Sequence, residues 1–129
     1  MPMSEYKRNH PRIKKSIPVE IVAPGERTLF ATTYDVSKRG VQLLCDGITV
    51  REIFGGPGLS RPTKPPKVFL KLRLSHSGQE PEQIEAECRA VFSRRVSEQE
   101  YRVGLQIYAI SEPSSVALDN FIDDCLELS

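Results

Sequence analysis

Residues 28–45 read TLFATTYDVSKRGVQLLC. The first half, Thr28–Val36, is rich in β-branched and aromatic side chains, and the last five residues, Val41–Cys45, are again mostly apolar. Between the two runs stands Ser-Lys-Arg-Gly, a short polar segment that ends in glycine. Two strand-like runs joined in this way predict an antiparallel hairpin.

Alternation with a period of two extends on both sides of this hairpin. Apolar residues occupy every second position in four further segments, residues 17–21, 68–75, 84–93 and 101–108. Each segment therefore predicts a strand with one apolar and one wet face. Together with the hairpin they favour an all-β fold, a six-stranded antiparallel β-barrel, which we expect to span residues 16–110.

A helical spacing of apolar residues follows the last strand. The stripe is formed at positions i, i+3, i+4, i+7 and i+8 by Leu118, Phe121, Ile122, Cys125 and Leu126. It predicts a C-terminal α-helix over residues 111–129. Glycines and prolines are dense between the third and fourth strands, so we expect a long irregular loop at residues 46–66 in place of a helix. Its role as a plain crossover, a lid or a partner contact is left open.

The charges are unevenly distributed although the net charge is only +1. Basic residues gather in residues 1–15, a polar terminal segment that we expect to be a flexible arm. Acidic residues gather in residues 111–129. A near-neutral total argues against duplex nucleic acid as a partner, which requires a broad basic surface. No apolar stretch is long enough for membrane insertion and no signal peptide is evident, so we expect a cytoplasmic protein.

The residues that usually carry catalysis or bind metals show no recognisable pattern. The three cysteines, Cys45, Cys88 and Cys125, are widely spaced, so we interpret them as buried apolar residues and expect no disulfide and no metal site. The chain has two histidines, and neither has a nucleophile motif beside it. We therefore expect a protein that is not an enzyme.

Two arginines just before the first strand are the first candidates for ligand binding. Arg8 and Arg12 lie four residues apart, and Pro11 prevents a regular helix between them. The guanidinium fork of arginine pairs with phosphate oxygens or with the Hoogsteen edge of guanine, and its flat face stacks on a base. Two such groups could hold a ligand with phosphates and guanines.

The hairpin supplies the second group of candidates. Asp35 and Ser37 are two residues apart on a strand, so both side chains face the same way. A carboxylate accepts hydrogen bonds from the N–H groups of guanine, and a hydroxyl can donate or accept. Gly40 fits either a turn position with positive φ or a close approach of the backbone to a ligand. An ordinary hairpin, in which Asp35 and Ser37 satisfy local backbone groups, is the plainer interpretation of each residue alone.

Together the two segments resemble the paired signatures of the PilZ family. Arg8 and Arg12 match RxxxR, and the hairpin matches [D/N]xSxxG. The resemblance covers roughly residues 6–110, and the C-terminal helix matches the helix that commonly follows the barrel. It implies a PilZ-type β-barrel that binds cyclic di-GMP at its rim as a ligand, with no cofactor. Lys7 stands where many members have a further arginine, and we include it among the ligand-binding candidates; it leaves open whether one or two ligand molecules bind.

Because residues 1–12 are polar, charged and terminal, we further expect a receptor that changes conformation on ligand binding and signals to a protein effector of unknown identity. The resemblance implies that Arg8 and Arg12 contact phosphates and guanine edges, while Asp35 and Ser37 contact a guanine. Two alternatives stay open. One is a PilZ-like protein-interaction module that binds no nucleotide. The other is a small barrel that binds single-stranded nucleic acid, with Phe30, Tyr34 and Phe69 as stacking candidates, although strand alternation assigns some of these to the core.

Overall fold

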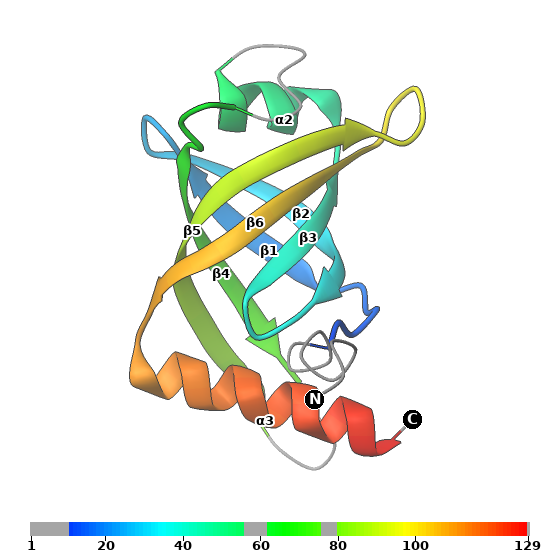
Figure 1. The fold of residues 1–129 in the computed structure, drawn as a ribbon, viewed down its shortest axis with the longest axis vertical. Coiled ribbons are helices and arrows are strands. Elements are labelled where there is room, and N and C mark those ends of the chain that lie inside the picture. Colours follow the sequence, from blue (N-terminus) through cyan, green and yellow to red (C-terminus); the bar gives the residue numbers. More distant parts are fainter. Residues whose placement is uncertain (1–10, 56–61, 76–79, 129) are drawn as a thin grey trace, which may run out of the picture.

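The computed structural model describes residues 11–55, 62–75 and 80–128. They form a closed antiparallel barrel with the strand order β1-β2-β3-β6-β5-β4 and a long helix after the last strand (Figure 1). The elements in chain order are β1 Pro18–Ala23, β2 Arg27–Val36, β3 Gly40–Cys45, α2 Gly47–Phe54, β4 Lys67–Leu74, β5 Glu82–Arg95, β6 Tyr101–Ile110 and α3 Glu112–Leu128. The predicted six-stranded barrel and C-terminal helix are confirmed.

The barrel closes because every strand turns one apolar face inward. On β4 the alternate residues Val68, Leu70, Leu72 and Leu74 are all buried, while the residues between them are exposed or half-buried. Full burial of a side chain of this size contributes about 1.5–3 kcal/mol to the stability of the fold. The six strands and two helices all supply side chains to a single hydrophobic core. The core is therefore the main source of the stability of the fold.

The helix α2 was not expected, because we predicted an irregular loop over residues 46–66. The glycines and prolines that break a helix begin only at Gly55, which ends α2 with a left-handed φ of 77°. At the other end, the Asp46 carboxylate accepts a hydrogen bond from the backbone N–H of Thr49 at 2.8 Å. Eight residues with a capped start and an apolar side formed by Val50 and Ile53 are enough for a helix that covers one end of the barrel.

The helix α3 lies at the opposite end of the barrel from α2 (Figure 1). Leu118, Phe121 and Ile122 from the predicted stripe are buried, whereas Leu126 is 43% exposed. The Ser114 hydroxyl accepts a hydrogen bond from the backbone N–H of Glu85 at 3.2 Å, which attaches the start of α3 to β5. The two helices therefore cover the two ends of the barrel (Figure 1).

The N-terminal segment is attached to β2 from Ile13 onward. Ile13 forms a β-bridge with Val36, with N–O distances of 2.8 and 2.9 Å. The Thr33 hydroxyl donates to the carbonyl of Lys15 and accepts from the backbone N–H of Ile17. The last residues of the predicted flexible arm, residues 1–15, are therefore hydrogen-bonded to the barrel at Ile13 and Lys15, and its first ten residues lie outside the described ranges. Lys7 and Arg8 lie outside the described residues.

Candidate functional site

The guanidinium of Arg12 lies against both predicted side chains of the hairpin. Its Nη2 is 2.9 Å from Oδ1 of Asp35, and its Nη1 donates a long hydrogen bond of 3.4 Å to Oγ of Ser37. The side chain of Asp35 is only 6% exposed, but that of Arg12 is 41% exposed. One motif therefore meets the other at this point, and the outer side of the guanidinium faces solvent.

The carboxylate of Asp35 keeps capacity to accept further hydrogen bonds. Its Oδ2 accepts from Nε2 of Gln42 at 3.4 Å. Its Oδ1 is buried and, although close to Arg12, accepts no hydrogen bond of acceptable geometry from the described residues. The ion pair with Arg12 at 2.9 Å is therefore the interaction that this buried oxygen makes, and the remaining capacity of the carboxylate lies at Oδ2.

Ser37 closes the tight turn of the hairpin. Its Oγ accepts from the backbone N–H groups of Arg39 at 3.3 Å and Gly40 at 3.2 Å, and lies 3.2 Å from the Gly40 carbonyl. The backbone N–H of Ser37 donates to that same carbonyl at 2.8 Å. Ser37 is fully buried, and its bonds shape the turn that holds Arg12. Ser37 therefore satisfies local backbone groups, as expected for an ordinary hairpin.

Gly40 is required for a close approach of two strands. Its φ is not positive; among the described glycines only Gly25 and Gly55 have a positive φ. A Cβ atom at Gly40 would lie 2.4 Å from the backbone oxygen of Leu105 on β6. The positive φ predicted for Gly40 is therefore not observed; the close approach that the structure shows is to the backbone of β6, and an approach to a ligand stays a prediction.

A pocket of about 260 Å³ opens on the outer wall beside Arg12. Besides Arg12 and Gly40 it is lined by Gln42 of β3, Phe92 of β5 and Gly104 of β6. We call it the outer-wall pocket. The pattern of the sequence did not predict its residues outside the two signatures, because they come from three strands and meet only through the register of the sheet.

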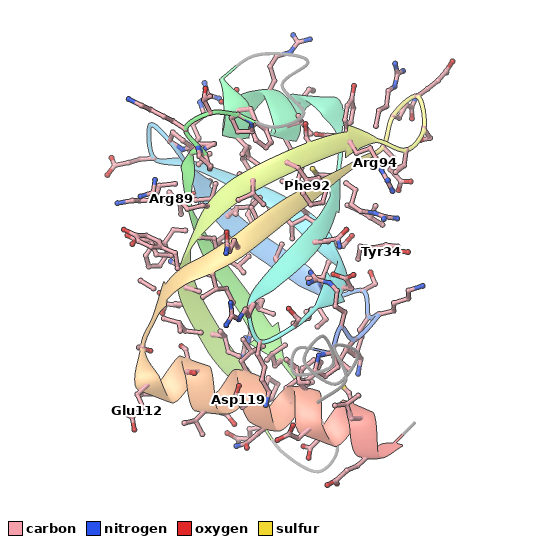
Figure 2. All side chains as sticks on the ribbon, viewed as in Figure 1. Tyr34, Arg89, Phe92, Arg94, Glu112 and Asp119 are labelled. Carbon is pink, nitrogen blue, oxygen red and sulfur yellow. The ribbon has the colours of Figure 1, made fainter. Side chains whose placement is uncertain are left out.

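A second group of cationic and aromatic side chains lies on β2 and β6. The guanidinium of Arg102 on β6 stands 3.8 Å from the centroid of the Tyr34 ring on β2, within the range of a cation–π contact. The amine of Lys14 is 5.9 Å from the same ring. In Figure 2 Tyr34, Phe92 and Arg94 are labelled on strands β2 and β5 of the wall. Basic and aromatic side chains therefore lie together on this part of the outer wall.

The other two stacking candidates lie on the outer surface, which corrects the expectation that alternation buries some of the aromatic residues. Phe30 is 72% exposed and Phe69 is 38% exposed. They pair across the sheet with Glu20 and Val22 on the outward face of β1. Neither lines the outer-wall pocket.

The buried cysteines Cys45 and Cys88 have unreactive thiols. Burial raises the pKa of Cys45 to about 12, with a smaller contribution from the negative charge of Asp46. Burial likewise raises the pKa of Cys88 to about 12, with Glu87 adding to it. Both thiols therefore stay protonated and non-nucleophilic near neutral pH. Over the ranges that the structure covers, no cluster of three or more His, Cys, Asp or Glu could hold a metal ion, and no helix is long and apolar enough to cross a membrane.

Comparison with known proteins agrees with this fold. The family model of the PilZ domain matches residues 6–124. Among solved structures, the inhibitor of motility MotI/DgrA of Bacillus subtilis matches with a TM-score of 0.68 and 19% identity, over 95% of this chain and 53% of that chain. The PilZ domain of YcgR from Escherichia coli with c-di-GMP matches with a TM-score of 0.58 and 12% identity, over 95% and 94% of the two chains.

The PlzA protein of Borreliella burgdorferi in complex with c-di-GMP matches with a TM-score of 0.55 and 13% identity, over 97% of this chain and 53% of that chain. The chain thus spans about half the length of MotI and of PlzA. No curated protein matches the sequence. At these identities the structural likeness establishes the fold.

Proposed function

From the fact that this chain belongs to the PilZ domain family, we propose that it is a receptor for cyclic di-GMP that signals to a protein effector. The observation that carries the proposal is the contact of Arg12 with both Asp35 and Ser37, which joins the two family signatures in one place. The PilZ domain of YcgR and the PlzA protein were both solved with c-di-GMP. A receptor for an intracellular second messenger acts in the cytoplasm, and we propose that compartment.

The contacts suggest what each residue does. An arginine side chain has five N–H donors, and the exposed side of the Arg12 guanidinium has donors left for phosphate oxygens. The carboxylate of Asp35 is proposed to accept from the N–H groups of a guanine edge on the strength of the sequence motif. Ser37 and Gly40 hold the turn in shape. Arg8 and Lys7 are proposed as further phosphate contacts on the strength of the sequence motif alone.

A signal can leave the site through contacts with α3. Lys38, in the middle of the turn, lies 3.7 Å from the Asp123 carboxylate of α3. The Lys15 amine lies 5.4 Å from the centroid of the buried Phe121 ring of the same helix. Arg12 already lies on the wall without ligand; we propose that ligand binding draws the residues before it, 1–11, onto the wall and shifts this turn. Hydrogen exchange should then slow in residues 1–11 when cyclic di-GMP is added, and unchanged exchange would refute the switch.

Isothermal titration with cyclic di-GMP, with GTP and GMP as controls, tests the receptor proposal. We expect saturable binding of the cyclic dinucleotide alone, and a loss of at least tenfold in affinity in Arg12→Ala and in Arg8→Ala. Arg27→Ala is the matched control, since Arg27 is also exposed and ion-paired, with Glu52. It stands eight residues from Asp35 on β2, roughly 26 Å away along the strand.

Two results would contradict the proposal. An absence of binding by the wild-type protein would favour a PilZ-like protein-interaction module. Binding that is unchanged in Arg12→Ala, or equally weakened in Arg27→Ala, would remove Arg12 from the site and leave only general charge attraction. The titration also gives the stoichiometry that Lys7 leaves open. An affinity for oligonucleotides that falls steeply with salt, without such a fall in the affinity for the dinucleotide, would favour the single-stranded nucleic acid alternative.

A further inference from the structure

A second hollow, of about 490 Å³, lies where the wall of the barrel meets the start of α3. We call it the α3 groove. Its lining comes from three strands and the helix and includes Phe69, Glu85, Glu87, Ala109, Ile110 and Ser114. Among the described residues, none lines both this groove and the outer-wall pocket. In Figure 2 Arg89 of β5 and Glu112 of α3 lie at one edge of the molecule, and Tyr34 lies at the other edge. The groove is therefore a surface separate from the signature site.

Strand register brings the groove together. Phe69 of β4 stands opposite Glu87 of β5, and Glu87 stands opposite Ala109 of β6, so the three form a row across the wall. The Ser114 hydroxyl of α3 accepts a hydrogen bond from the backbone N–H of Glu85 at 3.2 Å, which attaches the helix to the middle strand of this row. The hollow is therefore bounded by a sheet and a helix that are hydrogen-bonded to each other.

Aromatic side chains are exposed in and beside the groove. Phe69 is 38% exposed and Tyr108, the residue before Ala109, is 52% exposed. A register shift at Glu87/Cys88 gives Tyr108 no opposite residue on β5, and bulges of this kind re-aim a side chain. The Arg89 guanidinium lies 4.7 Å from the centroid of the Tyr108 ring. Tyrosine, phenylalanine and arginine are enriched in protein interfaces, so this surface has the composition of a docking site.

The charge of the groove indicates the chemistry of its partner. In the described part of the chain, both charged side chains that line it are acidic, Glu85 and Glu87, and they point to the same side of β5. Glu87 lies 3.7 Å from the Lys67 amine, whereas Glu85 is exposed and accepts a long hydrogen bond of 3.4 Å from Gln83. A charged donor would bind the Glu85 carboxylate more strongly than this amide does. The groove therefore disfavours nucleic acid and other anions and favours a cation.

We propose that the α3 groove is the docking site for a basic amphipathic segment of a protein partner. An apolar side chain of that segment contacts Phe69 and Ala109, and a lysine or arginine pairs with Glu85. The inference rests on the proposed function, because it names the surface on which the effector docks. Helix α3 connects the two sites, since it carries Ser114 at the groove and Asp123 at 3.7 Å from Lys38 of the signature turn.

The test uses two matched peptides of about 18 residues, long enough for an isolated helix, one made of leucine and lysine and the other of leucine and glutamate. Fluorescence anisotropy measures the binding of each to the full chain. We expect the lysine peptide to bind saturably and the glutamate peptide not to bind. Ala109→Arg places a large side chain in the hollow and a positive charge opposite Glu87, and Glu85→Lys reverses the charge of the rim. Each variant should weaken binding of the lysine peptide at least about tenfold.

Glu127→Lys is the matched control, because it makes the same change of charge as Glu85→Lys on an exposed residue. Glu127 stands thirteen residues after Ser114 on α3, roughly 20 Å along the helix, which is beyond the screening length at physiological salt. We expect its affinity for the lysine peptide to stay within about twofold of the wild type. A loss in Glu127→Lys as large as that in Glu85→Lys would overturn the docking site and leave only general charge attraction.

The other outcomes separate this inference from the receptor proposal. A lysine peptide that does not bind, that binds no better than the glutamate peptide, or that binds both groove variants normally overturns the docking site. Cyclic di-GMP should bind Ala109→Arg and Glu85→Lys as it binds the wild type. Peptide binding by a protein that binds no cyclic di-GMP overturns the receptor proposal and leaves the docking site. Thermal unfolding checks each variant; if Ala109→Arg is not folded, Glu85→Lys decides, since Glu85 is exposed.

Discussion

Gly40→Ala is expected to destabilise the barrel, because the new methyl group would meet backbone that cannot turn away. The Cβ atom would lie 2.4 Å from the Leu105 carbonyl oxygen, whereas carbon–oxygen contacts between strands are normally about 3.3–3.6 Å. Strands β3 and β6 must therefore separate locally by about 1 Å. The neighbouring bond from Ile107 N–H to the Arg39 carbonyl, now 2.8 Å, would then lengthen beyond the usual limit of about 3.2 Å.

The size of the effect follows from these changes. Overpacking of this kind costs about 1–3 kcal/mol and a lost hydrogen bond about 1 kcal/mol. Alanine also stabilises the folded state by about 0.5–1 kcal/mol relative to glycine, because it has less conformational freedom in the unfolded chain. The free energy of unfolding should thus fall by about 2–3 kcal/mol, which corresponds to a fall of about 10 °C in melting temperature for a domain of this size.

Urea unfolding followed by circular dichroism measures this difference. Gly47→Ala is the control, because a Cβ atom there would lie 3.4 Å from a ring carbon of Tyr101 and would sit at the start of α2. We expect its stability to stay within about 0.5 kcal/mol of the wild type. A Gly40→Ala protein with the unfolding midpoint of the wild type would refute the reasoning. Since Gly40 also holds Ser37 in the turn, the variant should bind cyclic di-GMP more weakly even where it is folded.

Three further predictions follow from the described contacts. Arg12→Ala should lower the free energy of unfolding by about 1–2 kcal/mol, because Asp35 stays buried without its cation, and the loss should shrink in an Asp35→Asn background; a double-mutant cycle in urea that shows no coupling would contradict this. Asp46→Ala should cost about 1 kcal/mol as a lost helix cap. The hydrogen bond from the Thr49 backbone lowers the pKa of Asp46, so this stabilisation should be present above the ordinary pKa of 3.8 and disappear as pH falls through the lowered value; a wild-type advantage that persisted in strong acid would argue against it. Iodoacetamide at pH 8, followed by peptide mapping, should leave Cys45 and Cys88 unmodified until urea unfolds the chain, and rapid labelling of the folded protein would show that their thiols are accessible.

Several features could be predicted from the sequence because their causes are local. Alternation over residues 17–21, 68–75, 84–93 and 101–108 reflects strands with one buried face, and β1, β4, β5 and β6 appear at those places. The stripe at Leu118, Phe121 and Ile122 likewise predicted α3, whose buried side it forms. The contact of Arg12 with the hairpin was expected only from the pairing of two motifs.

The helix α2 was missed although its signals are also local. Asp46 stands three residues before Thr49, in the arrangement of a helix cap, and Val50 and Ile53 have helical spacing. The glycines and prolines from Gly55 to Pro66 indicate a loop more strongly than these signals indicate a helix. Eight residues give too few repeats of a helical period to stand out, so only packing of Val50 and Ile53 on the barrel shows that the helix is stable.

What a strand sequence determines by itself is which residues share a face. It does not determine which residues of the neighbouring strand stand opposite them, because that depends on hydrogen bonds between distant segments and on bulges such as those at Thr33/Asp35 and Ala90/Phe92. The exposure of Phe30, the contact of Gly40 with β6 and the row from Phe69 to Ala109 all follow from register. The sequence therefore determined the barrel and the signature residues, and only the tertiary structure decided what surrounds them.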